Sequence, residues 1–164
     1  MLRTIPYLAC LFFAWVVACS PTSGTQNYGT AGEQGELADA LIGEWRNYSL
    51  RIILNTAHGT DESEELNFNE SNWDELMGMK PARTFFQNNG SYYTEYRNLR
   101  DSIFQVATGA WQIRGDSLIM AESNFTYRYR LKIQGEFGEF TANVDGDEDG
   151  EWDDTYIEVQ RKVK

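Results

Sequence analysis

The stretch Phe125-Thr-Tyr-Arg-Tyr-Arg-Leu-Lys-Ile133 has an apolar or aromatic side chain at every second position, with threonine, arginine and lysine between them. One face of this segment is therefore apolar and the other is polar. A helix would scatter these apolar side chains around its circumference, whereas an antiparallel strand with one buried face keeps them together. The stretch predicts such a strand.

Similar alternating segments recur along the chain, and turn signals separate them. Asn88-Asn89-Gly90 and Arg114-Gly115-Asp116 contain residue types that accept positive φ, as tight hairpin turns require. A meander of eight or more short hairpin-connected strands tends to close on itself, because closure removes its free edges. We therefore expect an all-β fold, an antiparallel up-and-down barrel of about eight to ten strands. The expected strands are 48–54, 82–87, 91–97, 102–108, 110–114, 117–121, 125–133, 137–144 and 155–163.

Two segments interrupt the period of two. Residues 36–41 read as a short helical turn, and residues 71–77 predict a second helix that begins at a capping-box-like Ser71 and ends at Gly78. The second helix falls in an insertion, 55–80, between the first two expected strands. Such an insertion either covers one mouth of a small barrel or packs on its outside, and both arrangements remain open.

The start of the chain reads as a secretory leader. The apolar run of residues 8–18 follows Arg3 and is shorter than the roughly 20 residues that a membrane-spanning helix needs. The stretch Val16-Val17-Ala18-Cys19 resembles the lipobox of bacterial lipoproteins. This resemblance implies cleavage before Cys19, a lipid anchor on Cys19 and, because Ser20 follows, a place on the outer membrane that faces the periplasm or the cell surface.

Three parts of the chain follow from this reading. Residues 1–18 form the signal peptide, residues 19–36 form a lipidated flexible tether of small and polar residues, and residues 37–164 form one barrel domain.

The net charge is −11, with 14 Lys and Arg against 25 Asp and Glu. Nucleic acid is not an expected partner, because binding its phosphates requires clustered cations.

The opening Leu41-Ile-Gly-Glu-Trp45 places a Gly-x-Trp motif near the first strand of the expected barrel. Together with residues 83–93, 109–119 and 153–156, it resembles the lipocalin (calycin) pattern, as found in bacterial lipocalin-like lipoproteins of unassigned function. The resemblance covers residues 40–162. It implies that Trp45, with Gly43, closes one end of the barrel and that Arg161 of the last strand covers Trp45.

The interior of an eight-stranded barrel is either packed with side chains or holds one small ligand. One hypothesis is that the barrel binds a small apolar or amphipathic molecule at the cell envelope. The other is that the barrel is solidly packed and that the protein is a non-enzymatic accessory protein, which docks onto another envelope protein. On the first hypothesis, the candidate ligand contacts are Trp111, Tyr127, Tyr129, Leu131 and Phe140.

Residues 145–154 contain seven carboxylates among ten positions, in the loop expected before the last strand. They open with the Asp-x-Asp-x-Asp-Gly pattern of an EF-hand calcium loop, in which alternate carboxylates converge on a hard cation. The carbonyl of Glu151 and the side chain of Asp153 would add to the carboxylates of Asp145, Asp147 and Asp149.

An EF-hand supplies a bidentate Glu at the twelfth position, but this chain has Tyr156 there, and strands are expected on both sides of the loop. A true EF-hand is therefore not expected. A weak calcium site of another geometry and a solvated hairpin loop both remain open. Calcium is the one cofactor that the sequence suggests.

We expect no enzymatic activity. His58 is the single histidine and lies among loop-forming residues, so neither a histidine metal cluster nor a Ser-His-Asp triad is indicated. The glycines are dispersed through turns rather than gathered in a phosphate-binding loop.

Overall fold

Strands dominate the computed structural model, which describes residues 31–164 without 56, 58–59 and 61. The side chains of residues 31–34 also lie outside the description. None of the described helices is both long and apolar enough to span a membrane. The elements are α1 (Ala31–Leu41), β1 (Gly43–Leu54), β2 (Glu64–Asn69), α2 (Trp73–Met77), β3 (Met79–Phe86), β4 (Ser91–Asn98), β5 (Ile103–Arg114), β6 (Ser117–Ala121), β7 (Thr126–Gln134), β8 (Phe137–Val144) and β9 (Asp154–Lys162).

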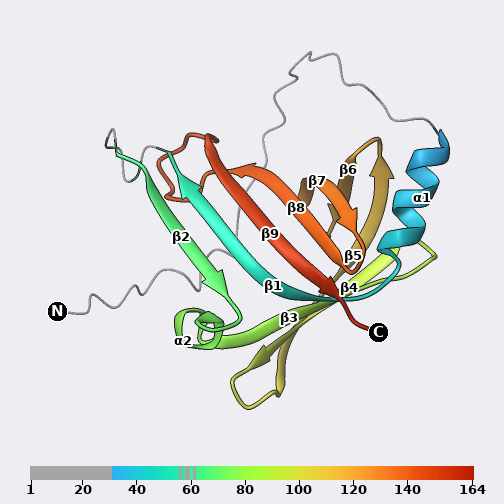
Figure 1. The fold of residues 1–164 in the computed structure, drawn as a ribbon, viewed down its shortest axis with the longest axis horizontal. Coiled ribbons are helices and arrows are strands. Elements are labelled where there is room, and N and C mark those ends of the chain that lie inside the picture. Colours follow the sequence, from blue (N-terminus) through green and yellow to red (C-terminus); the bar gives the residue numbers. More distant parts are fainter. Residues whose placement is uncertain (1–30, 56, 58–59, 61) are drawn as a thin grey trace.

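Eight of the strands close into an antiparallel barrel (Figure 1). Their order is β1-β3-β4-β5-β6-β7-β8-β9, and β9 pairs back onto β1. The closing ladder runs from the pair Trp45 and Lys162 to the pair Ile53 and Thr155. This architecture confirms the predicted all-β, up-and-down barrel.

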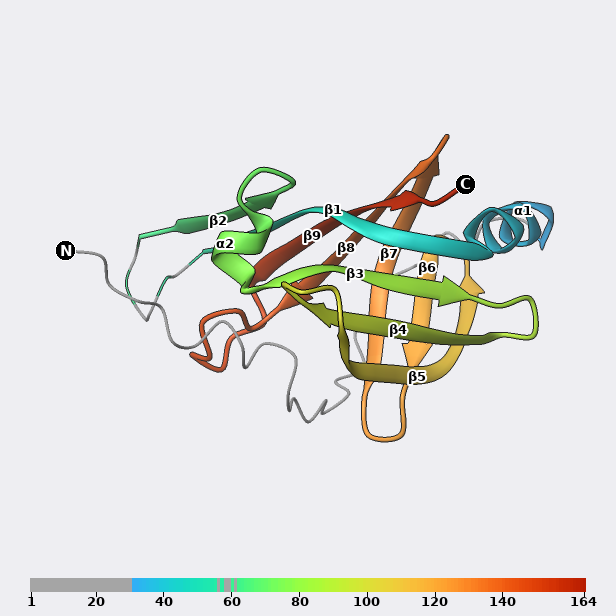
Figure 2. The same ribbon diagram turned by 90° about the horizontal axis from the view of Figure 1, so that it is seen from below.

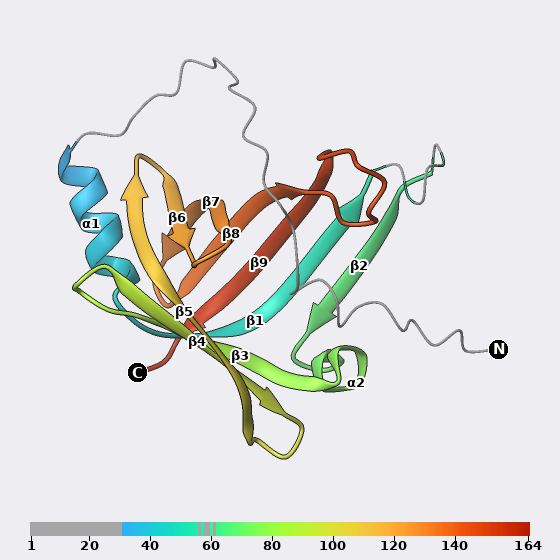
Figure 3. The same cartoon turned by 180° about the vertical axis from the view of Figure 1, so that it is seen from behind.

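Strand β2 lies outside the barrel. On the edge away from β9, β1 pairs with β3 over Gly43–Arg46 and with β2 over Ser49–Leu54. β2 therefore continues the wall beside β1, as Figures 1 and 3 show from opposite sides. β2 belongs to the insertion 55–80, in which the sequence predicted no strand. The segment was missed because Leu66 and Phe68 are the only apolar residues of β2.

The two ends of the barrel differ (Figure 2). Helix α1 lies at one end, called here the helix end, where Leu41 and Trp45 are completely buried. The indole Nε1 of Trp45 donates a hydrogen bond of 2.6 Å to the carbonyl of Leu41. The opposite end, the loop end, carries β2, α2 and the loop between β8 and β9.

Lys162, rather than Arg161, is the cation that covers Trp45. The Nζ atom of Lys162 lies 5.4 Å from the centroid of the Trp45 ring and donates to the carbonyl of Ala40 at 2.6 Å. Arg161 lies instead over the ring of Tyr48, at 5.5 Å. Neighbouring residues on a strand point to opposite faces, so the role that the resemblance gave to Arg161 belongs to the residue after it.

Both helices differ in extent from the prediction. Helix α1 begins at Ala31, so residues 31–36 are helical although the sequence predicted a flexible tether there. The rest of the tether, and Cys19, lie outside the described residues. The N-cap of α2 is Asn72 and not Ser71, and no side-chain hydrogen bond caps it, whereas Gly78 ends the helix at φ 66° as predicted.

Strand β5 is continuous where two strands, 102–108 and 110–114, were predicted. Gly109, the residue between the two predicted strands, lies within this strand. A Cβ atom at this position would lie 2.7 Å from the ring of Tyr92 and 2.3 Å from the carbonyl oxygen of Ala121. Glycine is therefore present for close packing and not for a turn.

Replacing Trp45 by alanine should leave a cavity at the helix end and remove the hydrogen bond to Leu41. We expect the free energy of unfolding to fall by about 3 to 5 kcal/mol, measured by urea titration with circular dichroism. The control is Trp152→Ala, because Trp152 is 49% exposed; its effect should be within about 1 kcal/mol. Equal losses in the two variants would contradict the role of Trp45.

Candidate functional site

The register of the strands defines the inner face of the barrel, because directly paired residues point to the same side of a sheet. Near the helix end this inner face is apolar and closely packed. Six of its side chains are 3% exposed or less: Trp45, Phe86, Tyr92, Leu118, Leu131 and Phe140. The predicted contacts Leu131 and Phe140 thus belong to the packed core around Trp45.

Polar side chains are also buried inside the barrel. Thr84 pairs with Trp45 and with Thr94, and the two threonine hydroxyls lie 3.0 Å apart. On β9, Glu158 pairs with Phe140 and Gln160 pairs with Asn47. Each of these four buried polar side chains is 7% exposed or less, and we call them the polar girdle: Thr84, Thr94, Glu158 and Gln160.

Glu158 is the carboxyl group of the polar girdle. The side-chain amide of Asn47 donates to it, and the side chains of Gln160 and Tyr156 also hydrogen-bond to it. Burial raises the pKa of Glu158 to about 7, although these two hydrogen bonds favour the charged form. The carboxyl can therefore change its protonation state near neutral pH.

Gln160 is incompletely paired. Its Oε1 atom is buried and has no hydrogen-bond partner among the described residues. A buried acceptor left unpaired costs about 1 to 3 kcal/mol. The interior thus presents an acceptor oxygen, next to a carboxyl group, for which these residues supply no donor.

Tyrosines line the inner face around Glu158. Burial is the main cause of the raised pKa values of Tyr96, Tyr129 and Tyr156, and the charge of Glu158 is the second. The ring centroids of Tyr129 and Tyr156 are 6.1 Å apart, and those of Tyr129 and Tyr127 are 6.4 Å apart. Tyr127 is 38% exposed, so the row of rings from Tyr156 through Tyr129 to Tyr127 leads from the polar girdle towards solvent.

Trp111 is held by the β3–β4 turn. Its Nε1 atom donates to the carbonyl of Ser91 at 3.0 Å and to that of Gln87 at 3.1 Å. Its ring meets Phe86 edge to face at 5.8 Å. These contacts give Trp111 a structural role beside the apolar core.

The sequence pattern did not predict four residues of this site: Tyr96, Tyr156, Glu158 and Gln160. In β9 the polar residues Glu158 and Gln160 alternate with Ile157 and Val159, a pattern that is usual for a strand whose apolar residues face inwards. The sequence did contain one indication that the polar face lies inside: the aromatic residue Tyr156 shares that face with Glu158 and Gln160.

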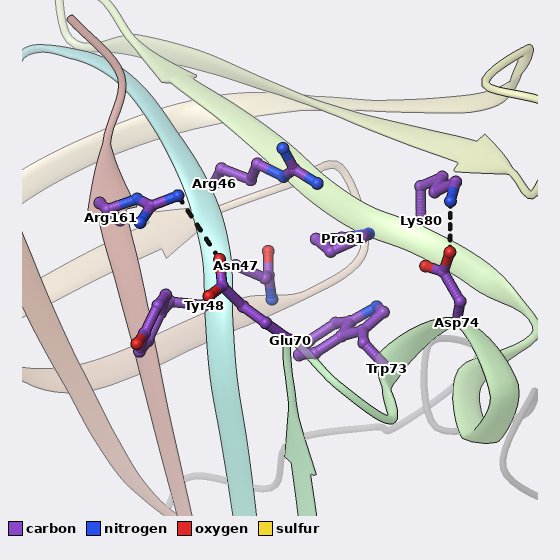
Figure 4. A pocket seen from close by; sticks show the side chains of 9 residues that line it. All are labelled: Arg46, Asn47, Tyr48, Glu70, Trp73, Asp74, Lys80, Pro81 and Arg161. Carbon is purple, nitrogen blue, oxygen red and sulfur yellow. Dashed lines mark hydrogen bonds and ion pairs between the residues drawn. The ribbon is translucent and has the colours of Figure 1, made fainter.

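A separate pocket of about 190 Å³ lies at the point along β1 where its pairing partner changes from β3 to β2 (Figure 4). Glu70 accepts from Arg161, and Asp74 accepts from Lys80. The volume of this pocket is below the roughly 300 Å³ at which sites for drug-sized ligands begin. The lining residues are Arg46, Asn47, Tyr48, Glu70, Trp73, Asp74, Lys80, Pro81 and Arg161.

The acidic loop joins β8 to β9, as predicted. In the described part of the chain, Asp145, Asp147 and Asp149 have carboxylate oxygens within 4.8 Å of one another. Glu151 and Asp153 are not part of this group, and the carbonyl of Asp153 accepts from the side chain of Asn55. His58 lies outside the described residues.

Comparison with protein-family models, with curated proteins and with solved structures finds no match to this chain. The closed eight-stranded antiparallel barrel is compatible with a lipocalin-like fold.

The stability of the protein should depend on pH through Glu158. Its pKa in the folded protein, about 7, is above the ordinary value of 4.5, so the folded state binds the proton more tightly than the unfolded chain. Stability from this group is present below pH 4.5 and is lost as the pH rises through 7, by about 3 kcal/mol.

Urea titrations at pH 5 and pH 8 measure this loss. Glu158→Gln should remove it, whereas Glu139→Gln, on the outer face of β8, should keep the pH dependence of the wild type. If Glu158→Gln follows the wild type across this pH range, the carboxyl does not titrate in a buried site.

Proposed function

We propose that this protein is a lipid-anchored binding module of the bacterial outer membrane and that its barrel takes up one small amphipathic molecule. The observation that carries the proposal is the unpartnered Oε1 atom of Gln160 beside the buried carboxyl of Glu158. A core that served stability alone would gain from apolar side chains at these positions. Polar groups inside a barrel are understandable if a ligand completes their hydrogen bonds.

The chemistry of the polar girdle indicates the kind of ligand. Gln160 Oε1 requires a donor, which a hydroxyl, amide or amine group would provide. The rings of Tyr127 and Tyr129 offer an apolar surface for the body of the molecule. A ligand with an amine head would also be favoured by the charged form of Glu158 and by the faces of the tyrosines.

Binding, rather than catalysis, is the proposed role. Among the described residues, the polar girdle contains one carboxyl group, and its hydrogen bonds come from Asn47, Gln160 and Tyr156. General acid–base chemistry of the glycosidase kind requires a second carboxyl across the substrate. Another glutamate, Glu122, accepts instead from the hydroxyl of Tyr92 at 3.0 Å.

A variant that fills the barrel tests the proposed binding site. Ala107 pairs with Thr94 and points inwards, whereas Ala110 is exposed on the outer face of the same strand. Ala107→Phe should weaken the uptake of a fluorescent arylamine, N-phenyl-1-naphthylamine, about tenfold or more, because its ring occupies the interior. Ala110→Phe should bind the probe like the wild type.

Near-ultraviolet circular dichroism and thermal melts of both variants control for misfolding. Equal probe binding by the two folded variants would remove the barrel interior as the site.

Lipid attachment requires a separate test. In bacterial cells, mass spectrometry of the N-terminal peptide should find fatty acids on Cys19, and the protein should sediment with the outer membrane. Cys19→Ala should lose the acyl mass, whereas Cys10→Ala should keep it, because Cys10 lies in the predicted leader. A wild-type protein without acyl groups would exclude the anchor.

The alternative function is that of an accessory protein with a packed barrel, and one observation favours it. The β4–β5 hairpin exposes a group of apolar side chains, between 47% and 57% of each: Leu99, Ile103, Phe104 and Val106. Native mass spectrometry of the protein extracted from its own membrane separates the two functions. A retained small molecule supports the binding module, and a retained protein supports the accessory role.

A further inference from the structure

The loop between β8 and β9 lies at the loop end of the barrel (Figure 2). Three carboxylates converge in this loop. We infer that this loop is a calcium site in which Asp145, Asp147 and Asp149 hold the ion. The site is distinct from the polar girdle, and its occupation does not depend on the proposed ligand.

The spacing of the three carboxylates suits a single calcium ion. One oxygen of each side chain lies within 4.8 Å of the others. Calcium binds oxygen at 2.3 to 2.6 Å, so two ligands on opposite sides of one ion are about 5 Å apart. These separations place the three side chains close enough for one ion to contact them after small side-chain movements.

Asp145 supplies an independent observation. Its side chain is 5% exposed, and its Oδ1 atom is buried without a hydrogen-bond partner among the described residues. Its Oδ2 atom accepts from the backbone N–H of Gly150 at 3.1 Å. An unpaired oxygen of a buried carboxylate is costly, and a bound cation would remove that cost.

The backbone of the loop holds the other two carboxylates in place. The N–H of Asp149 donates to Asp147 at 3.3 Å, and the N–H of Glu151 donates to Asp149 at 2.8 Å. Gly150 has φ 94°, a conformation that glycine adopts most readily, and it turns the chain back towards Asp145. These hydrogen bonds hold the half-buried Asp147 and the exposed Asp149 near Asp145.

Asp154 has a different role. Its Oδ1 atom accepts from the N–H of Asn55 at 2.9 Å, and its Oδ2 atom accepts from the N–H of Gly146 at 2.6 Å. Both oxygens are therefore used to fix the loop to the end of β1. Calcium at this site would order the rim of the barrel at the loop end, where β8, β9 and β1 meet.

The donor set determines which ion binds and how tightly. The three ligands are carboxylate oxygens, which suit calcium, and their arrangement in a loop suits calcium's flexible geometry better than the strict octahedron of magnesium. The remaining ligands would be backbone carbonyls and water. Because Tyr156 replaces the bidentate Glu of an EF-hand, we expect a dissociation constant of about 10⁻⁴ to 10⁻³ M.

A thermal melt of the full chain with calcium tests the site. About 10 mM calcium should raise the Tm by about 5 °C, and magnesium at the same concentration should raise it much less. Asp147→Asn should abolish the calcium shift. Glu148→Gln is the matched control, because it removes the same charge from the same loop but not a residue of the cluster, and it should keep the shift.

Terbium luminescence gives a second measurement that does not depend on stability. Trp152 lies in the same loop, so its excitation should sensitise a terbium ion bound there, and calcium should compete with that signal. Asp147→Asn should remove the sensitised emission, and Glu148→Gln should retain it.

Three outcomes would overturn the inference: no calcium shift in the wild type, an equal shift with magnesium, or an equal shift in Asp147→Asn. The last two would mean that divalent ions only screen the negative charge of the loop.

Discussion

The antiparallel ladder between β1 and β9 closes the barrel, and the interior depends on its register. A bulge between Asn47 and Ser49 shifts the inward-facing positions of β1 from odd to even numbers. As a result Trp45 faces the helix end of the interior, while Leu50 and Ile52 face inwards nearer the loop end. A slip of one residue would turn all of these side chains to the other face, so the bulge is as necessary to the interior as the apolar residues themselves.

Alternation predicted the barrel well because most strands follow it without interruption. In β7, Leu131 and Ile133 face the apolar core, and the turns at Gly90 and Gly115 have the positive φ that their sequences required. The prediction was wrong in two places, at the middle of β5 and at β2. The predicted strands were divided at Gly109, but close packing against Tyr92 explains this glycine, and the weakly apolar β2 is stabilised by its pairing with β1.

The candidate site was harder to predict than the fold, because β9 reverses the usual pattern. Its polar residues Glu158 and Gln160 face the barrel interior, and Ile157 and Val159 face outwards. A strand with two half-apolar faces does not reveal which one is inside. The register with β1 and β8 decides it, and this register is a property of the closed barrel rather than of the segment.

The same strand connects both candidate sites. β9 begins at Asp154, whose carboxylate holds the acidic loop to Asn55, and two residues later Tyr156 begins the inner face that leads to Glu158 and Gln160. Ladders with β1 and β8 hold β9 along its length. An ion in the loop would therefore order the rim without moving the polar girdle, because the strand between them is already fixed on both edges.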